Sequence, residues 1–319
     1  LAPYRALMRA GLLPAVLTSH AMYPALDRRM PATLSAAVLT GLLRRRLGFR
    51  GAVLSDDLEM AAIERRHGLE GAVGLAVRAG VDLVMICHTY DKMRRGIAHL
   101  RELASRDPAV ARRVRESAGR VAALKRRARG GPFPPLRSPA AQRLAAAQAR
   151  RAFTVIRNGA GLLPLRLAPA SRLVVVDPLH TMYGWNQPVR LGAAFRRRHP
   201  RTRAVLFDPR EPARSLRAAL ALARRADVVV AGTYNARFSP AQAVLVRRLA
   251  ALGGRPGRPA LAVLAVRDPQ DLSAFPSVRT YAACYNFYDV SLQAAADAML
   301  GLTPATGRCP VPLLAEGSG

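Results

Sequence analysis

The sequence has no apolar run near 18 residues, few cysteines and no phosphate-binding glycine fingerprint. Without a long apolar run, we expect no segment to span a membrane. Cys87, Cys284 and Cys309 are odd in number and lack metal-ligand spacing, which argues against a disulfide framework or a zinc site. A phosphate-binding glycine loop joins a strand to the helix that follows it, whereas Gly253-Gly254 lies in a loop before a strand. We therefore expect neither a cofactor nor a metal ion.

Lysine and aromatic residues are also scarce. The aromatic content is 5%, and 48 of the 50 basic residues are arginines, with a net charge of +30. The arginines follow the polar faces of the expected helices, and no aromatic stacking platform accompanies them. We expect no specific nucleic-acid partner, although this charge predicts weak, salt-sensitive binding to nucleic acid or to acidic cell-wall polymers.

The N-terminal part shows three consecutive strand–helix units. Near-continuously apolar strands are expected at 14–17, 52–54 and 81–87, and helices at 38–47, after Ser35, and at 69–79. Such strands are typical of a parallel sheet that is covered on both faces. Three units cannot close a barrel. Because the chain also begins at Leu1, we expect about five further units upstream in a longer protein.

The C-terminal part predicts a second layered α/β structure, an open sheet with helices on its faces. Gly130-Gly131-Pro132-Phe133-Pro134-Pro135 is the clearest linker. We divide the chain into 1–130, a linker and connecting helix at 131–152, and a C-terminal domain at 153–319. Strands are expected at 153–156, 173–176, 204–207, 228–231 and 261–266, and helices at 92–105, 108–129, 139–151, 212–225 and 240–252.

Two adjacent carboxylates, Asp56 and Asp57, follow the second apolar strand. Neighbouring residues of an extended chain point in opposite directions, so the two side chains cannot share one pocket. The carboxyl ends of barrel strands hold catalytic residues, which makes one aspartate a catalytic candidate. The alternative is an N-cap for the next helix. A pair allows one residue for each role.

A long, ordered motif resembles a known family. It reads Thr18-Ser19-His20-Ala21-Met22-Tyr23-Pro24-Ala25-Leu26-Asp27, then Pro31-Ala32-Thr33-Leu34-Ser35, then Leu47-Gly48-Phe49-Arg50-Gly51-Ala52-Val53-Leu54-Ser55-Asp56-Asp57-Leu58-Glu59-Met60. It is similar to family 3 glycoside hydrolases, and most to the NagZ-like bacterial β-N-acetylglucosaminidases that act on muropeptides in peptidoglycan recycling. Residues 153–159, 162–165, 267–272 and 307–311 resemble the second domain of that family.

The resemblance implies an α/β fold: the C-terminal part of a (β/α)8 TIM barrel, about three βα units, followed by an α/β/α sandwich. It implies that Asp56 is the nucleophile of a retaining hydrolase, which forms a covalent glycosyl-enzyme. His20 and Met60 are candidate substrate-binding residues. A hydrogen bond to a loop carbonyl is the alternative for His20, and core packing is the alternative for Met60.

Other polar residues receive structural expectations. Asp57 should cap the helix or orient its neighbours, and His88 should lie near the rim of the pocket. The single tryptophan, Trp185, should anchor packing in the second domain. Surface or loop positions are expected for the remaining histidines, which are His67, His99, His180 and His199.

The implied activity is the release of terminal β-linked N-acetylglucosamine from glycans. The family's acid/base is a His–Asp pair on a loop with Lys-His and Gly-His signatures, which do not occur in this sequence. We therefore expect these 319 residues to be inactive alone. A β-glucosidase-like or glycosyl-phosphorylase activity is an alternative, because Asp56 would be the nucleophile in either reaction. A second alternative is a non-catalytic remnant that binds carbohydrate or polyanions. The sequence does not determine the oligomeric state. It also leaves open whether the protein acts in the bacterial cytoplasm or at the cell wall.

Overall fold

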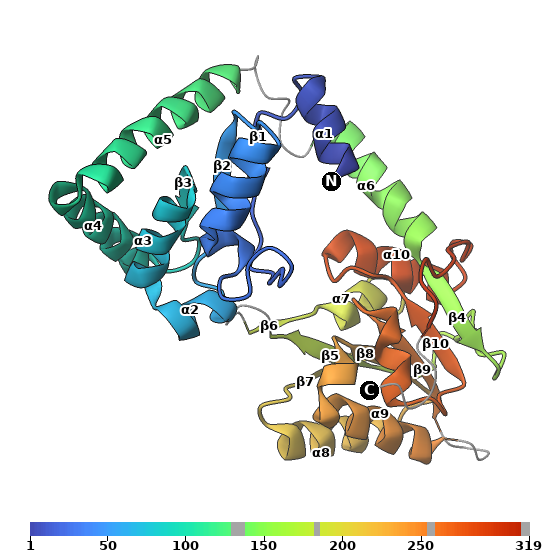
Figure 1. Ribbon diagram of the computed structural model, residues 1–319. Helices are drawn as coiled ribbons and strands as arrows, with labels where there is room; N and C mark the ends of the chain where they lie inside the picture. Colours follow the sequence, from blue (N-terminus) through green and yellow to red (C-terminus); the bar gives the residue numbers. More distant parts are fainter. Residues whose placement is uncertain (129–137, 182–185, 254–258, 314–319) are drawn as a thin grey trace. The chain divides into compact units, whose positions relative to one another are not determined.

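The computed structural model describes residues 1–128, 138–181, 186–253 and 259–313. The chain divides into two compact units, Leu1–Phe133 and Pro134–Gly319 (Figure 1). The domain limits drawn from the sequence, at 130 and 152, stay predictions. The expected linker at 130–135 lies outside the described residues.

The N-terminal unit contains a small parallel sheet. Strands β1 (Ala15–Leu17), β2 (Ala52–Asp57) and β3 (Leu83–Met85) lie in the order β1-β2-β3. Val16 pairs with Val53, and Leu54 pairs with Leu83, in parallel register. The expected side-by-side parallel strands are thus confirmed, with β2 in the middle.

Helices pack against this sheet through the apolar residues that the helical period places on one side. Leu39, Val53, Val73 and Ala76 share a buried core. Asp107 caps α5, because its carboxylate accepts the N–H groups of Ala109 and Val110. The helices are α1 (Ala2–Arg9), η1 (Ala32–Leu34), the wide π-helix η2 (Ala37–Arg46), α2 (Ala61–His67), α3 (Leu69–Ala79), α4 (Tyr90–Arg106) and α5 (Pro108–Arg127).

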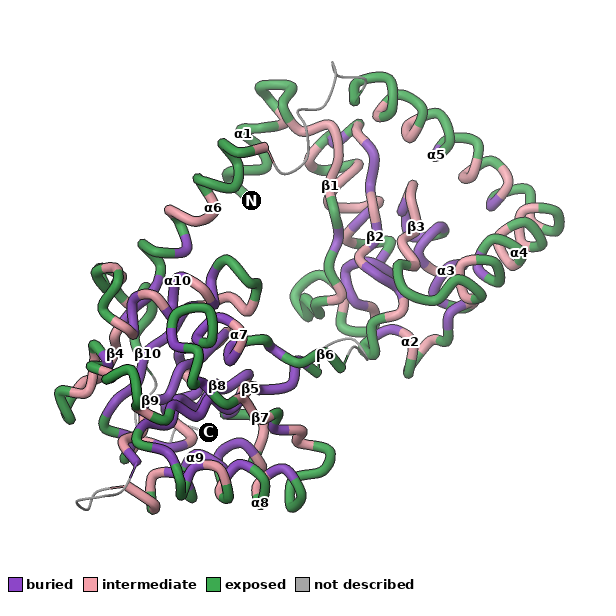
Figure 2. The backbone as a smooth tube through the Cα atoms, turned by 180° about the vertical axis from the view of Figure 1, so that it is seen from behind, coloured by how far each residue is buried: buried purple, intermediate pink, exposed green. Residues whose placement is uncertain are grey.

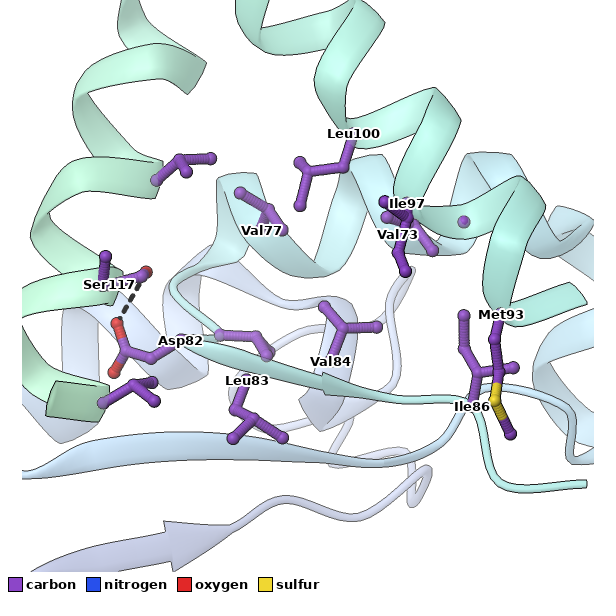
Figure 3. A pocket seen from close by; sticks show the side chains of 15 residues that line it. Val73, Val77, Asp82, Leu83, Val84, Ile86, Met93, Ile97, Leu100 and Ser117 are labelled. Carbon is purple, nitrogen blue, oxygen red and sulfur yellow. Dashed lines mark hydrogen bonds between the residues drawn. The ribbon is translucent and has the colours of Figure 1, made fainter. Parts of the chain in front are cut away.

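A buried carboxylate ties these elements together at the start of β3. Asp82, whose side chain is fully buried, pairs with Arg44 of η2 at 2.5 Å and with Arg113 and Arg120 of α5 at 2.6 and 3.1 Å. It also accepts the N–H of Val53 and the hydroxyl of Ser117, the bond drawn in Figure 3. Burial opposes its ionisation, but these hydrogen bonds hold the pKa of Asp82 below its usual value.

The C-terminal unit is a sheet between two helical layers. Its main path is β4-β10-β9-β8-β5-β6, and β7 pairs with β5. The pairs among β7, β5, β8, β9 and β10 are parallel, whereas β4 and β6 pair antiparallel. The strands are β4 (Thr154–Asn158), β5 (Leu173–His180), β6 (Gln187–Pro188), β7 (Thr202–Phe207), β8 (Val228–Thr233), β9 (Ala260–Ala265) and β10 (Thr280–Ala283).

Alternate residues of the central strands face different helices. Val175 and Val230 pack with α7 (Leu191–Arg196) and α10 (Asp289–Met299), whereas Val174 and Val229 pack with α8 (Pro212–Ala223) and α9 (Pro240–Leu252). These strands are buried over most of their length (Figure 2). The expected α/β/α sandwich is confirmed. The remaining helices of this unit are α6 (Pro139–Ala152), η3 (Ala236–Phe238) and η4 (Pro269–Ala274).

The surface or loop position expected for His180 is wrong. His180 ends β5, is 7% exposed, and stacks on Phe287 with ring centroids 4.6 Å apart. His199 lies in the loop between α7 and β7, as expected, but it is buried there: it is 8% exposed, and its Nε2 lies 2.7 Å from the carbonyl of Ser171. Both imidazoles are held in the interior because tertiary packing gives their rings partners.

Substitution of the buried carboxylate tests its structural role. We expect Asp82→Ala to lower the free energy of unfolding by about 3–5 kcal/mol, because three guanidiniums lose a buried partner. Glu102→Ala, which removes the exposed pair with Arg106, is the control and should cost less than about 1 kcal/mol. Urea unfolding measures both. Equal costs for the two variants would contradict this role.

Two carboxyls of the C-terminal unit predict a pH dependence. Burial raises the pKa of Asp177 and of Asp271 to about 6, from 3.8. Between pH 3.8 and about 6, each carboxyl is therefore protonated in the folded state and ionised in the unfolded chain. Its stabilising contribution is present at low pH and disappears as the pH rises through that window.

We expect Asp271→Asn to remove the contribution of Asp271. Relative to the parent chain, the variant should gain about 2–3 kcal/mol of unfolding free energy between pH 4 and pH 7, at about 1.4 kcal/mol per pKa unit. Chemical unfolding at both pH values measures this difference. A difference between variant and parent that does not change with pH would refute the raised pKa.

Candidate functional site

Asp56 and Asp57 lie within β2, at the carboxyl end of the middle strand. The sequence placed them after a shorter strand; the pairing of Asp57 with Met85 of β3 extends the strand through both. Asp56 is half-buried. Among the described residues, its carboxylate accepts one hydrogen bond, from the Asp57 N–H at 2.8 Å. Most of its oxygen lone pairs are therefore available to another partner.

Asp57, in contrast, is 8% exposed and is held from several sides. Its Oδ1 accepts the N–H groups of Glu59 and Cys87 at 3.1 and 3.3 Å, and its Oδ2 lies 3.1 Å from Nε2 of His88. The Asp57 carboxylate thus fixes the turn after β2 to the segment after β3. Asp57 orients its neighbours, as expected. Neither aspartate caps α2, whose N-cap residue is Met60 and has no side-chain hydrogen bond.

Glu59 is a polar site residue that the sequence analysis missed. Its Oε2 accepts the N–H groups of His88 and Thr89 at 2.6 and 3.0 Å, and its Oε1 lies 3.6 Å from Nζ of Lys92. Burial opposes its ionisation, but these hydrogen bonds, with the charge of Lys92, lower the pKa of Glu59 to about 2. Glu59 therefore remains ionised near neutral pH. Its position in the Asp-Asp-Leu-Glu run was the available signal.

His20 leaves β1 beside these groups. Its Nε2 lies 2.8 Å from the backbone oxygen of Asp57, and its Nδ1 lies 3.0 Å from the hydroxyl of Thr33. Because a carbonyl can only accept, Nε2 donates the hydrogen bond to Asp57. The Thr33 hydroxyl itself donates to the carbonyl of Ser19 at 2.9 Å. Both nitrogens have protein partners, which fits the structural alternative. Substrate binding by His20 stays a prediction.

Met60 is 39% exposed at the start of α2, so core packing does not describe it. Its contact with substrate also stays a prediction. His88 is 44% exposed at the side chain and has its ring against Asp57. The structure therefore gathers His20, Asp56, Asp57, Glu59 and His88 at one end of the sheet. Trp185 lies outside the described residues.

An apolar cavity of about 540 Å³ lies elsewhere in this unit, between β3 and helices α3, α4 and α5 (Figure 3). Val77, Val84, Ile97 and Leu100 are among its lining residues, and neither site aspartate is. Within the described ranges, no group of three or more His, Cys, Asp or Glu side chains could hold a metal ion. Across the same ranges, no helix has the length and apolar character needed to cross a bilayer.

Comparison with known proteins gives this arrangement a context. Residues 1–124 match the model of the glycosyl hydrolase family 3 N terminal domain. The resemblance drawn from the sequence is thus confirmed for the N-terminal unit, which is similar to the N-terminal domain of family 3 glycoside hydrolases. Within that family, the similarity is to β-N-acetylglucosaminidases and β-hexosaminidases.

Three relatives illustrate the similarity. A beta-hexosaminidase of Xylella fastidiosa is 42% identical over 88 residues, which are 28% of this chain and 26% of that protein. One from Neisseria meningitidis serogroup C is 37% identical over 91 residues, 28% of this chain and 25% of that protein. The matched segment thus spans about a quarter of each relative. A family 3 beta-N-acetylglucosaminidase structure from Paenibacillus sp. str. FPU-7 superposes with a TM-score of 0.80 at 28% identity, over 98% of this chain and 61% of that one.

The two adjacent aspartates should respond differently to truncation. We expect Asp57→Ala to lower the unfolding free energy by about 2–3 kcal/mol, because buried N–H groups lose a charged acceptor. Asp56→Ala removes an equal charge and an equal volume but should cost less than about 1 kcal/mol. Thermal or urea unfolding of both variants measures the contrast. If Asp56→Ala is the more costly substitution, the division of roles between the aspartates is wrong.

Proposed function

We propose that this sequence belongs to a retaining glycosidase that releases terminal β-linked N-acetylglucosamine, with Asp56 as nucleophile. The observation that carries the proposal is the contrast within β2: the Asp57 carboxylate is occupied by its neighbours, whereas that of Asp56 is largely free at the carboxyl end of the strand. The similarity to a β-N-acetylglucosaminidase supports the choice of sugar. Cell-wall fragments are the implied source of the glycan.

The proposed reaction has two steps. The Asp56 carboxylate attacks the anomeric carbon, and the bond between that carbon and the leaving oxygen breaks as the oxygen takes a proton. Water then attacks the glycosyl ester, a base removes its proton, and Asp56 leaves as a carboxylate. Retention of configuration follows from two inversions at the same carbon. Both steps need a group that gives and then takes a proton.

The acid/base loop implied by the resemblance has no counterpart in residues 1–319. Within the described residues, His88 is an imidazole held by a carboxylate beside Asp56, the arrangement that orients a histidine for proton transfer. We infer that efficient turnover needs such a loop. His88 would support at most slow turnover by the 319 residues alone.

Hydrolysis of an aryl β-N-acetylglucosaminide by the full-length gene product tests the proposal. We expect Asp56→Ala to reduce kcat/KM by roughly 10³-fold or more, because the covalent route is lost. Glu102→Ala, which removes an exposed carboxylate of α4 away from the site, is the control and should change it far less. Full activity in Asp56→Ala would exclude this nucleophile. Preference for an aryl β-glucoside, or for phosphate over water as acceptor, would favour the other activities of the family.

A further inference from the structure

A second cavity of the N-terminal unit lies at the opposite end of the sheet from Asp56. It has a volume of about 780 Å³ and is bordered by Gly48 and Phe49, just before β2, and by Gly80, just before β3. Asp56 lies five positions beyond Gly51 along the extended strand, which corresponds to about 16 Å. The cavity is therefore distinct from the proposed catalytic site. We call it the arginine cavity. Its basic lining residues are Arg44, Arg45, Arg50, Arg78, Arg112, Arg113 and Arg120.

Positive charge exceeds negative charge around the arginine cavity. Seven arginines line it, and Glu116 is the acidic residue in that lining. Two further carboxylates pair with lining arginines. Asp82 neutralises part of the charge of three of them, and Asp107 pairs with Arg78 at 2.5 Å. The carboxylates thus balance fewer than half of the guanidiniums.

Three of these guanidiniums are not engaged in the fold. Arg45, Arg50 and Arg112 are exposed, and the described residues provide none of them with an ion pair or hydrogen bond. They extend from η2, from the loop before β2 and from α5, and all three border the same hollow. Convergence from separate elements distinguishes this place from the arginines spread along the helices.

A fourth arginine has an unsatisfied donor. Nη1 of Arg113 is buried and has no hydrogen-bond partner, although it forms an ion pair with the Glu116 carboxylate at 3.5 Å. Its Nη2 is already bonded to Asp82 and to the carbonyls of Gly80 and Val81. A buried donor without an acceptor is costly, so an acceptor in the cavity would stabilise the arrangement.

We propose that the arginine cavity binds a small phosphate-bearing ligand with at least two negative charges. The planar guanidinium fork matches phosphate oxygens with two parallel hydrogen bonds, which favours phosphate over a halide or a single carboxylate. The volume lies in the range of small-molecule sites. This function is separate from the proposed glycosidase, because the ligand would sit at the amino ends of the strands and would not touch Asp56.

Titration of pyrophosphate into the full-length protein, followed by isothermal calorimetry at 150 mM salt, tests the proposal. The double variant Arg45→Ala/Arg112→Ala removes two uncommitted guanidiniums and leaves the Asp82 cluster intact. We expect one site per chain and at least a tenfold weaker affinity in this variant. The control Arg94→Ala/Arg101→Ala removes the same charge from α4 and should retain affinity within about twofold.

Further arms separate the sources of binding. Inorganic phosphate should bind more weakly than pyrophosphate. The Asp56→Asn variant should bind pyrophosphate as tightly as the parent does, so this test does not depend on the glycosidase proposal. Equal losses in the two double variants would show diffuse surface charge and overturn the proposal. So would the absence of pyrophosphate binding at 150 mM salt, or tight binding of a single-stranded oligonucleotide that pyrophosphate fails to displace.

Discussion

The Asp57 carboxylate is the contact on which the candidate site depends. It receives N–H groups from the segments that follow β2 and β3, and faces the ring of His88. His20 adds a bond to the backbone oxygen of the same residue. These contacts fix the backbone around Asp56. The Asp56 carboxylate itself accepts one hydrogen bond among the described residues, so most of its lone pairs are available to a substrate. One aspartate provides rigidity, and its neighbour is available for chemistry.

The same unit uses ionic contacts in a second way at the other end of its strands. Asp82 is buried and hydrogen-bonded from η2, β2 and α5, so it orders the elements around it. It also fixes the guanidiniums of Arg44, Arg113 and Arg120 along one side of the arginine cavity. The two ends of one small sheet therefore differ in charge: acidic groups gather at the carboxyl ends and guanidiniums at the amino ends.

Local pattern predicted much of this architecture. The helices at Leu69–Ala79 and Pro240–Leu252 match their expected limits because apolar spacing, proline and glycine mark both ends. Parallel pairing of the first three strands followed from their continuous apolar character. Strand β10 and helix α10 were missed. Thr280–Ala283 is short, and the buried face of α10 consists largely of four alanines and a serine, so no stripe of large apolar residues marks it.

Contacts between distant residues could not be predicted in this way. Asp82 meets arginines 38 and 31 positions away, and Asp57 meets His88 across a strand and two helices, so no spacing rule brings them together. His180 was expected at the surface or in a loop because histidine is polar, but it ends β5 and is buried against the ring of Phe287. The family motif singled out Asp56 as the expected nucleophile and left Asp57 to cap or to orient its neighbours. The particular contacts of Asp57 became evident only in the structure.

The most direct measurement is mass spectrometry of the full-length protein after reaction with a slow, fluorinated N-acetylglucosaminyl donor that carries a good leaving group. The account predicts a glycosyl mass increment on the peptide that contains Asp56, at that residue. An increment on Asp57, Glu59 or another side chain, or release of product with inverted configuration and no adduct, would contradict it.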